Sequence, residues 1–138
     1  MNIYITSTDT QAPSHFEVIK VGVNSVNFDN IPANSCSQII VERASELFDD
    51  PVKFLSSCFN LLRKDGTIKI LGIDLRTVCL SYVNGQMDSK TFNKSIINDH
   101  RSALSCDELL NAVKSLGMHV HRCDTQNNAM YELLATRK

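Results

Sequence analysis

The sequence predicts an α/β domain with a mostly parallel sheet, and three consecutive segments carry this prediction. A short apolar run over residues 38–42, bounded by polar residues, is typical of a buried parallel strand. An amphipathic helix follows from Asp50, and a second apolar strand follows over 67–73. Strands that alternate with helices in this way imply a sheet with helices on both of its faces.

The part of the chain before residue 38 supplies two more expected strands. Residues 2–7 alternate between polar and apolar side chains, and residues 16–23 are rich in β-branched side chains. The stretches 8–14 and 24–37 are polar and each contains proline, so we expect loops there. The N-terminal half is therefore expected to hold strands joined by loops.

The helix that follows residue 50 has local signals at both of its ends. Asp50 is a suitable N-cap, and Pro51 occupies the first helical position, where its missing N–H is tolerated. Arg63 and Lys64 lie at the C-terminal end, where cations interact favourably with the helix dipole. Gly66 is expected to supply the positive φ that closes the turn into the next strand.

Three more helices are predicted in the C-terminal half. Two short ones are expected over residues 75–82 and 89–97. Ser105 and Glu108 have the spacing of a capping box, which predicts the start of the third. Gly117 is expected to end that helix.

The chain ends with two predicted strands, over residues 118–123 and 130–136, joined by a polar loop. They predict an antiparallel hairpin that adds an antiparallel edge strand to the sheet. Because the sequence contains no internal repeat, residues 1–138 are expected to form a single domain.

Composition excludes several classes of function. The net charge of −1 gives no electrostatic reason to expect a nucleic acid or an anionic membrane as partner. No apolar run approaches the roughly 18 residues of a membrane span, and the N-terminus lacks the features of a secretory signal. The five cysteines show no Cys-x-x-Cys spacing, so we expect reduced thiols, mostly in the core, and a cytoplasmic protein.

A row of potential metal ligands lies on one predicted strand. His119, His121 and Cys123 alternate along the chain and should therefore share a face. A zinc site would need a fourth ligand or a water and a second shell, and no partner motif is present nearby. We therefore expect an exposed strand face and no metal site.

Five short motifs, taken in order, resemble those of a known family. They are residues 31–35 (Ile-Pro-Ala-Asn-Ser), 45–47 (Ser-Glu-Leu), 61–66 (Leu-Leu-Arg-Lys-Asp-Gly), 73–74 (Ile-Asp), and the helix 109–117 before the last hairpin. Their order and spacing resemble class I S-adenosylmethionine (SAM)-dependent methyltransferases, especially the small type 11 group. The resemblance implies a Rossmann-like three-layer sandwich with a C-terminal antiparallel hairpin and a reduced N-terminal half.

The sequence departs from this family where the family binds SAM. The family carries a Gly-x-Gly turn after its first strand, whereas this chain has Thr6, Ser7, Thr8 and Asp9 there. The acidic residue that holds the ribose after the second strand has no clear counterpart. Asn27 falls near the loop position that often carries an aspartate facing adenine. The resemblance therefore implies a SAM site that is weak or lost.

The resemblance nevertheless implies a set of candidate cofactor-binding residues at the ends of the strands. They are Thr6, Ser7, Asp9, Asn27 and Asp74. For Asp74 the alternative is a helix N-cap. For the stretch after the first strand the alternative is a simple polar loop.

Glu46, His100 and Arg101 are further candidates. Glu46 stands where the family often has a Glu-His pair, and His100 belongs to the residue type most often used for acid–base chemistry. His100 and Arg101 could bind an anion or take part in acid–base chemistry, and the alternative is a solvated loop.

Two functions follow from this pattern. The first is a non-catalytic methyltransferase-like protein, a pseudoenzyme that serves as an interaction or assembly module with a second copy or another protein. The alternative is an active SAM-dependent methyltransferase that acts on a small molecule or an unknown acceptor. The lost glycine turn favours the first, and the polar residues at the strand ends favour the second.

Overall fold

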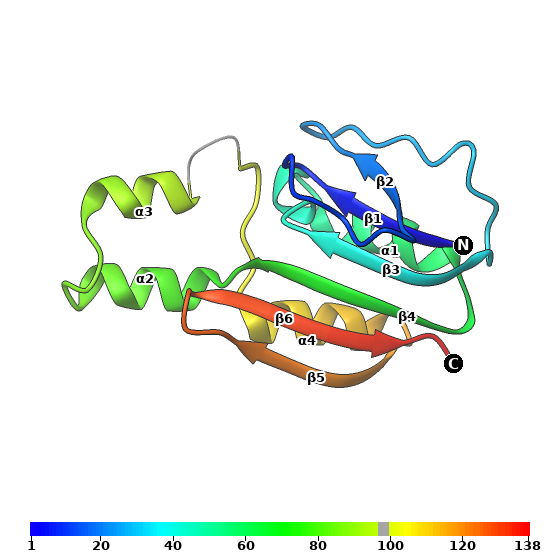
Figure 1. The fold of residues 1–138 in the computed structure, drawn as a ribbon. Coiled ribbons are helices and arrows are strands. Elements are labelled where there is room, and N and C mark those ends of the chain that lie inside the picture. Colours follow the sequence, from blue (N-terminus) through cyan, green and yellow to red (C-terminus); the bar gives the residue numbers. More distant parts are fainter. Residues whose placement is uncertain (97–99) are drawn as a thin grey trace.

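The computed structural model of the chain describes residues 1–96 and 100–138 (Figure 1). The strands are β1 (Asn2–Thr6), β2 (Glu17–Lys20), β3 (Cys36–Glu42), β4 (Leu62–Ile73), β5 (His119–Thr125) and β6 (Met130–Thr136). The helices are the 3-10 turn η1 (Ser45–Leu47), α1 (Pro51–Leu61), α2 (Leu75–Val83), α3 (Ser89–Ile96) and α4 (Cys106–Ser115). Ile97, the last residue expected in the helix α3, lies outside the described residues.

All six strands form one sheet in the order β2-β1-β3-β4-β6-β5. The pairs β1–β2, β1–β3 and β3–β4 are parallel, whereas β6 runs antiparallel to both β4 and β5. The mostly parallel sheet and the C-terminal hairpin are therefore confirmed. The expected antiparallel edge strand is corrected, because the antiparallel strand β6 is internal and the edge is formed by β5.

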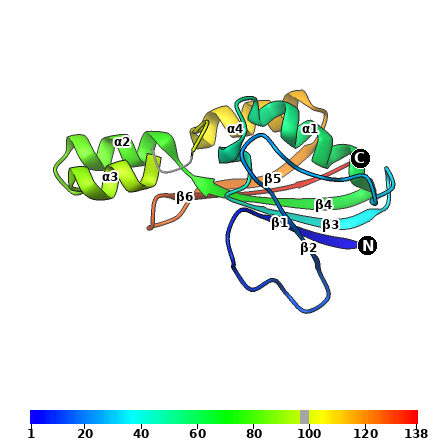
Figure 2. The same ribbon diagram turned by 90° about the horizontal axis from the view of Figure 1, so that it is seen from above.

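The helices α1 and α4 lie on the same face of the sheet (Figure 2). They cover a core made of alternate strand residues, among them Ile39 and Val41 of β3 and Ile68 and Ile70 of β4. No helix covers the opposite face in the part of the chain that the structure describes. The expected three-layer sandwich is thus reduced to two layers, because the connections around β2 are loops where a full sandwich has helices.

The uncovered face of the sheet is rich in polar side chains. Side chains alternate along a strand, so the residues between the core residues point to this face. Tyr4 donates a hydrogen bond to Glu42, and Glu132 lies between Lys69 at 3.0 Å and Arg122 at 2.8 Å. Parallel sheets are usually apolar on both faces. This polar composition therefore suits a face that remains in contact with solvent.

The local signals at the start of α1 are confirmed, and those at its end are not. The Asp50 side chain accepts a hydrogen bond from Lys53 N–H at 3.0 Å, as expected of an N-cap. The chain then enters β4 directly at Leu62, and Asp65 has the positive φ, of 62°, that was expected at Gly66. Glycine is needed at 66 for space, because a Cβ there would lie 2.9 Å from the Arg63 carbonyl oxygen.

The helices α2 and α3 form a helical arm that projects beyond the end of β4 (Figure 1). Their residues contact each other, with the rings of Tyr82 and Phe92 4.7 Å apart. Only Val78 is buried in α2, and no described residue is buried in α3. Leu80 and Val83 remain 50% and 77% exposed. The arm therefore carries apolar side chains in solvent.

Candidate functional site

A cavity of about 480 Å³ lies where β1, β3 and β4 reach their carboxyl ends. Open α/β sheets bind ligands at this edge. Its lining includes Ser7 after β1, Arg43 after β3 and Ile73 at the end of β4, together with Lys94 and His100 from outside the sheet. We refer to it as the strand-end cavity.

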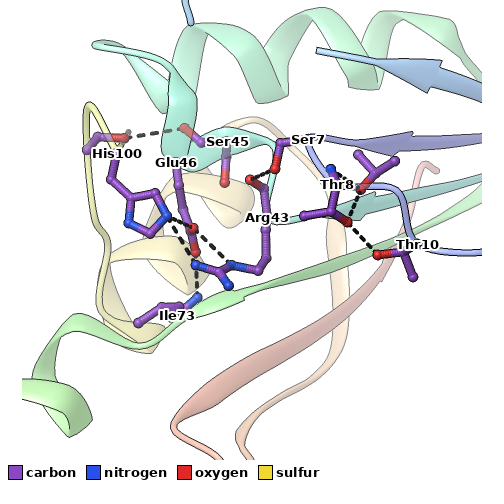
Figure 3. Close-up of polar contacts among 10 residues, drawn as sticks. Ser7, Thr8, Thr10, Arg43, Ser45, Glu46, Ile73 and His100 are labelled. Carbon is purple, nitrogen blue, oxygen red and sulfur yellow. Dashed lines mark hydrogen bonds and ion pairs between the residues drawn. The ribbon is translucent and has the colours of Figure 1, made fainter. Parts of the chain in front are cut away.

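The buried carboxylate of Glu46 organises one wall of this cavity (Figure 3). Glu46 lies on η1 with its side chain 4% exposed. Its Oε1 accepts a hydrogen bond from the Ile73 N–H at 2.6 Å, and its Oε2 accepts one from Arg43 Nε at 3.3 Å. The Oε2 atom also lies 3.0 Å from Nε2 of His100. The carboxylate thus joins three segments that are far apart in the sequence.

One ring nitrogen of His100 has two competing partners. Nε2 lies 3.1 Å from a terminal nitrogen of Arg43 and 3.0 Å from Oε2 of Glu46. The guanidinium can only donate and the carboxylate can only accept, so Nε2 satisfies one partner with a lone pair or the other with a proton. The position of the imidazole proton therefore decides whether His100 binds Arg43 or Glu46.

The backbone around this cluster is held by hydrogen bonds between neighbouring segments. Arg43 has a positive φ of 53°, and its N–H donates to the Leu71 carbonyl at 2.8 Å. Its own carbonyl accepts from the Ser7 hydroxyl at 3.2 Å. The N–H of Arg101 donates to the Glu46 carbonyl at 2.7 Å. Both sides of the cavity are therefore fixed to η1 and the strand ends.

Two of the predicted candidates, Glu46 and His100, are brought together here. Ser7 lines the cavity, and Thr6 lies buried below it, where its hydroxyl accepts from the Thr8 N–H at 3.1 Å. Sequence reasoning missed Arg43. The available signal was its position directly after a central parallel strand, which is where this cavity forms.

The other predicted residues lie elsewhere. Asp9 is exposed and pairs with Lys20, whose hydrogen bond holds the pKa of Asp9 below its ordinary value. Asn27 accepts from the Asp29 N–H at 2.9 Å within an exposed loop, and Arg101 pairs with Asp49 at 3.0 Å. Neither Asp9, Asn27 nor Arg101 is among the residues that line the strand-end cavity.

Asp74 serves as a structural hub. It caps α2 by accepting from Arg76 N–H at 3.2 Å, which confirms the N-cap alternative. It also accepts from the Thr77 hydroxyl at 3.0 Å, the Cys106 N–H at 3.3 Å and the Thr125 hydroxyl at 2.5 Å. Asp74 faces a second cavity of about 290 Å³, apart from the strand-end cavity.

The expected row of His119, His121 and Cys123 is not formed. A β-bulge interrupts the pairing of β5 between Val120 and Arg122, which changes the facing of the residues that follow. The two exposed histidine rings stack edge to face at 4.9 Å, whereas Cys123 points to Cys106 at the start of α4. No group of three potential metal ligands is found among the residues that the structure describes.

The strand-end cavity brings charged side chains of both signs to the ends of the strands. Lys94 contributes a positive charge, whereas Arg43 is paired with Glu46, both of whose oxygens have protein partners. The Ser7 side chain is held against the Arg43 carbonyl by its hydrogen bond.

Neither a scan against protein-family models nor a search of curated proteins finds a match. Solved structures do match. A SAM-dependent methyltransferase from Thermotoga maritima aligns with a TM-score of 0.61 at 15% identity, over 89% of this chain and 65% of its own. The fold is that of the class I methyltransferases.

Two further structures agree with this assignment of fold. A SAM-dependent methyltransferase from Methanosarcina mazei aligns at a TM-score of 0.57 and 10% identity, over 99% of this chain and 82% of its own. A complex between the Haloferax volcanii Trm112 methyltransferase activator and a methyltransferase matches at 0.59 and 12%, over 91% and 63%. The chain thus spans less than two thirds of the length of the first matched structures.

In the described ranges, the longest apolar helical segments fall short of what crossing a membrane requires.

Proposed function

We propose that this chain is a non-catalytic methyltransferase-like domain that serves as a protein interaction module. The observation that carries the proposal is the positive lining of the strand-end cavity, where methyltransferases of this fold bind SAM. Lys94 would repel the sulfonium centre, and the bridging Ser7 side chain would crowd the methionine end.

The helical arm supports the interaction part of the proposal. Leu80 and Val83 are three residues apart on α2 and so lie on one face of the helix. Exposed apolar side chains on a projecting element are typical of interaction sites. The Haloferax volcanii structure, in which a methyltransferase is bound to an activator protein, is a precedent for partner binding by this fold.

Self-association is the form of the proposal that the purified chain alone can test. We expect size-exclusion chromatography with light scattering to report a dimer for the wild type and a monomer for Leu80→Ser/Val83→Ser. Val18→Ser is the matched control, because Val18 on β2 is similarly exposed, at 46%, but lies outside the arm. A wild-type chain that stays monomeric at every concentration would contradict self-association through the arm.

SAM binding tests the other half of the proposal. Calorimetry with SAM should give no saturable heat. S-adenosylhomocysteine, which lacks the sulfonium charge, is the comparison ligand. If charge is the reason, Lys94→Gln should improve binding of SAM more than binding of S-adenosylhomocysteine. Saturable SAM binding by the wild type would instead favour the alternative, an active methyltransferase that uses the same cavity.

A further inference from the structure

Two cysteine sulfurs meet at the start of α4. Sγ of Cys106 lies 2.7 Å from Sγ of Cys123, although the two residues are 17 positions apart in the chain. Both thiols are half-buried, and both line the smaller cavity beside Asp74. Nonbonded sulfurs rarely approach this closely, whereas cysteines at this separation need little movement to form a bond.

We propose that Cys106 and Cys123 form a reversible disulfide when the protein meets a hydroperoxide. The cavity gives a small oxidant access to both sulfurs. The remaining cysteines are arranged differently: Cys36 and Cys58 are buried in the core, and Cys79 lies on α2 in the helical arm. The proposal does not depend on the function proposed above.

The surroundings of the two sulfurs assign them different roles. Cys106 is the first residue of α4, and its carbonyl oxygen accepts a hydrogen bond from the Cys123 thiol at 3.6 Å. Burial raises the pKa of Cys123, and the neighbouring Cys106, Asp124 and Asp107 raise it further, so Cys123 stays protonated. Cys106 is therefore the attacking sulfur and Cys123 the resolving one.

The reaction proceeds in two balanced steps. The Cys106 thiolate attacks one peroxide oxygen and the O–O bond breaks. The leaving group is hydroxide from hydrogen peroxide, or an alkoxide from an organic hydroperoxide, and it takes a proton to become water or an alcohol. Cys106 is then a sulfenic acid. The sulfur of Cys123 displaces the hydroxyl group, forming the S–S bond and breaking the S–O bond, while the Cys123 proton leaves in a water molecule. The two thiols lose two electrons, and the peroxide gains them.

The bond would tie the first turn of α4 to strand β5. The Asp74 carboxylate already accepts hydrogen bonds from Cys106 N–H and from Thr125 on that strand. A disulfide would fix this junction covalently and restrain the segment that leads from His100 to α4. Oxidation should therefore raise the thermal midpoint of the protein by roughly 5–10 °C.

The experiment is peroxide treatment of the full chain, blocking of free thiols with N-ethylmaleimide, and peptide mass mapping. We expect a loss of two hydrogen masses, one peptide pair that joins Cys106 to Cys123, and reversal by dithiothreitol. Cys106→Ser and Cys123→Ser should each abolish the linked pair and the rise in thermal midpoint, whereas Cys79→Ser should retain both.

Three results would overturn the inference. One is a linked pair that involves Cys36 or Cys58. Another is oxidation of Cys106 to a sulfinic acid with Cys123 left free. The third is a wild-type chain with all thiols still reactive after peroxide treatment. Mapping on the wild type keeps the test decisive even where a serine variant folds poorly.

Discussion

Two buried carboxylates, Glu46 and Asp74, lie near the same end of the sheet and have opposite kinds of partners. Both residues are less than 5% exposed. Glu46 is bound by a guanidinium and an imidazole as well as a backbone amide. Asp74 is bound by hydroxyls and backbone amides. Glu46 therefore holds charged side chains beside a cavity, whereas Asp74 joins secondary structure elements to one another.

The largest expected effect comes from removing the carboxylate of Glu46. Glu46→Ala leaves Arg43 and the Ile73 N–H without their acceptor, so we expect a loss of about 3–5 kcal/mol in the free energy of unfolding, measured by urea denaturation. Glu46→Gln is the control, because it keeps an acceptor for Ile73 and should lose less. If Glu46→Ala lost less free energy of unfolding than Asp74→Ala, the contrast between the two sites would be contradicted.

A smaller loss is expected at the second carboxylate. Asp74→Ala removes the N-cap of α2 and the acceptor for α4 and β5, which should cost about 2–3 kcal/mol. Asp74→Asn keeps one oxygen in place and should cost about half as much. Hydrogen exchange at α2 should increase in Asp74→Ala and stay unchanged in Glu46→Ala, because only Asp74 caps that helix.

The smallest expected effect on stability comes from Tyr131, whose ring lies within the electrostatic reach of both carboxylates. Burial raises the pKa of Tyr131, and the charges of Glu46 and Asp74 raise it further. The folded state therefore holds the phenol proton more tightly than the unfolded chain. This stabilisation is complete below the unfolded pKa of about 10 and is lost with rising pH, by about 1.4 kcal/mol per pH unit, until the folded pKa is reached.

Urea denaturation between neutral and alkaline pH measures this loss. Tyr131→Phe should reduce the loss of unfolding free energy with rising pH. Tyr4→Phe is a useful comparison, because burial and Glu42 also raise the pKa of Tyr4, on the uncovered face. Equal alkaline slopes in the wild type and Tyr131→Phe would show that folding does not raise the pKa of Tyr131.

Local signals made much of the fold predictable. The Asp50 cap and the Ser105–Glu108 capping box depend on residues three positions apart, and the structure contains both. The turn expected before a strand over 67–73 was assigned to Gly66, because glycine favours positive φ. Asp65 adopts that conformation instead, and Gly66 leaves space for the Arg63 carbonyl.

The site was less predictable, because most of the residues that meet there are distant from one another in the sequence. Arg43 pairs with Glu46 at a spacing of three residues, but His100 is 57 residues from Arg43 and no local pattern pairs it with either. The Cys106–Cys123 contact was hidden in the same way, since a β-bulge in β5 sets the direction of Cys123. Position at a strand end indicated the neighbourhood of the site, but the chemistry of the site depends on tertiary placement.

The position of Asp74 at the base of the helical arm has a mechanical consequence. The arm is joined to the sheet through the first turn of α2, which Asp74 caps while also holding α4 and β5. A partner that binds Leu80 and Val83 would transmit force along α2 to the Asp74 carboxylate at its first turn. Force on the arm would therefore reach the Cys106–Cys123 junction through Asp74 and the strand-end cavity through Lys94 of α3.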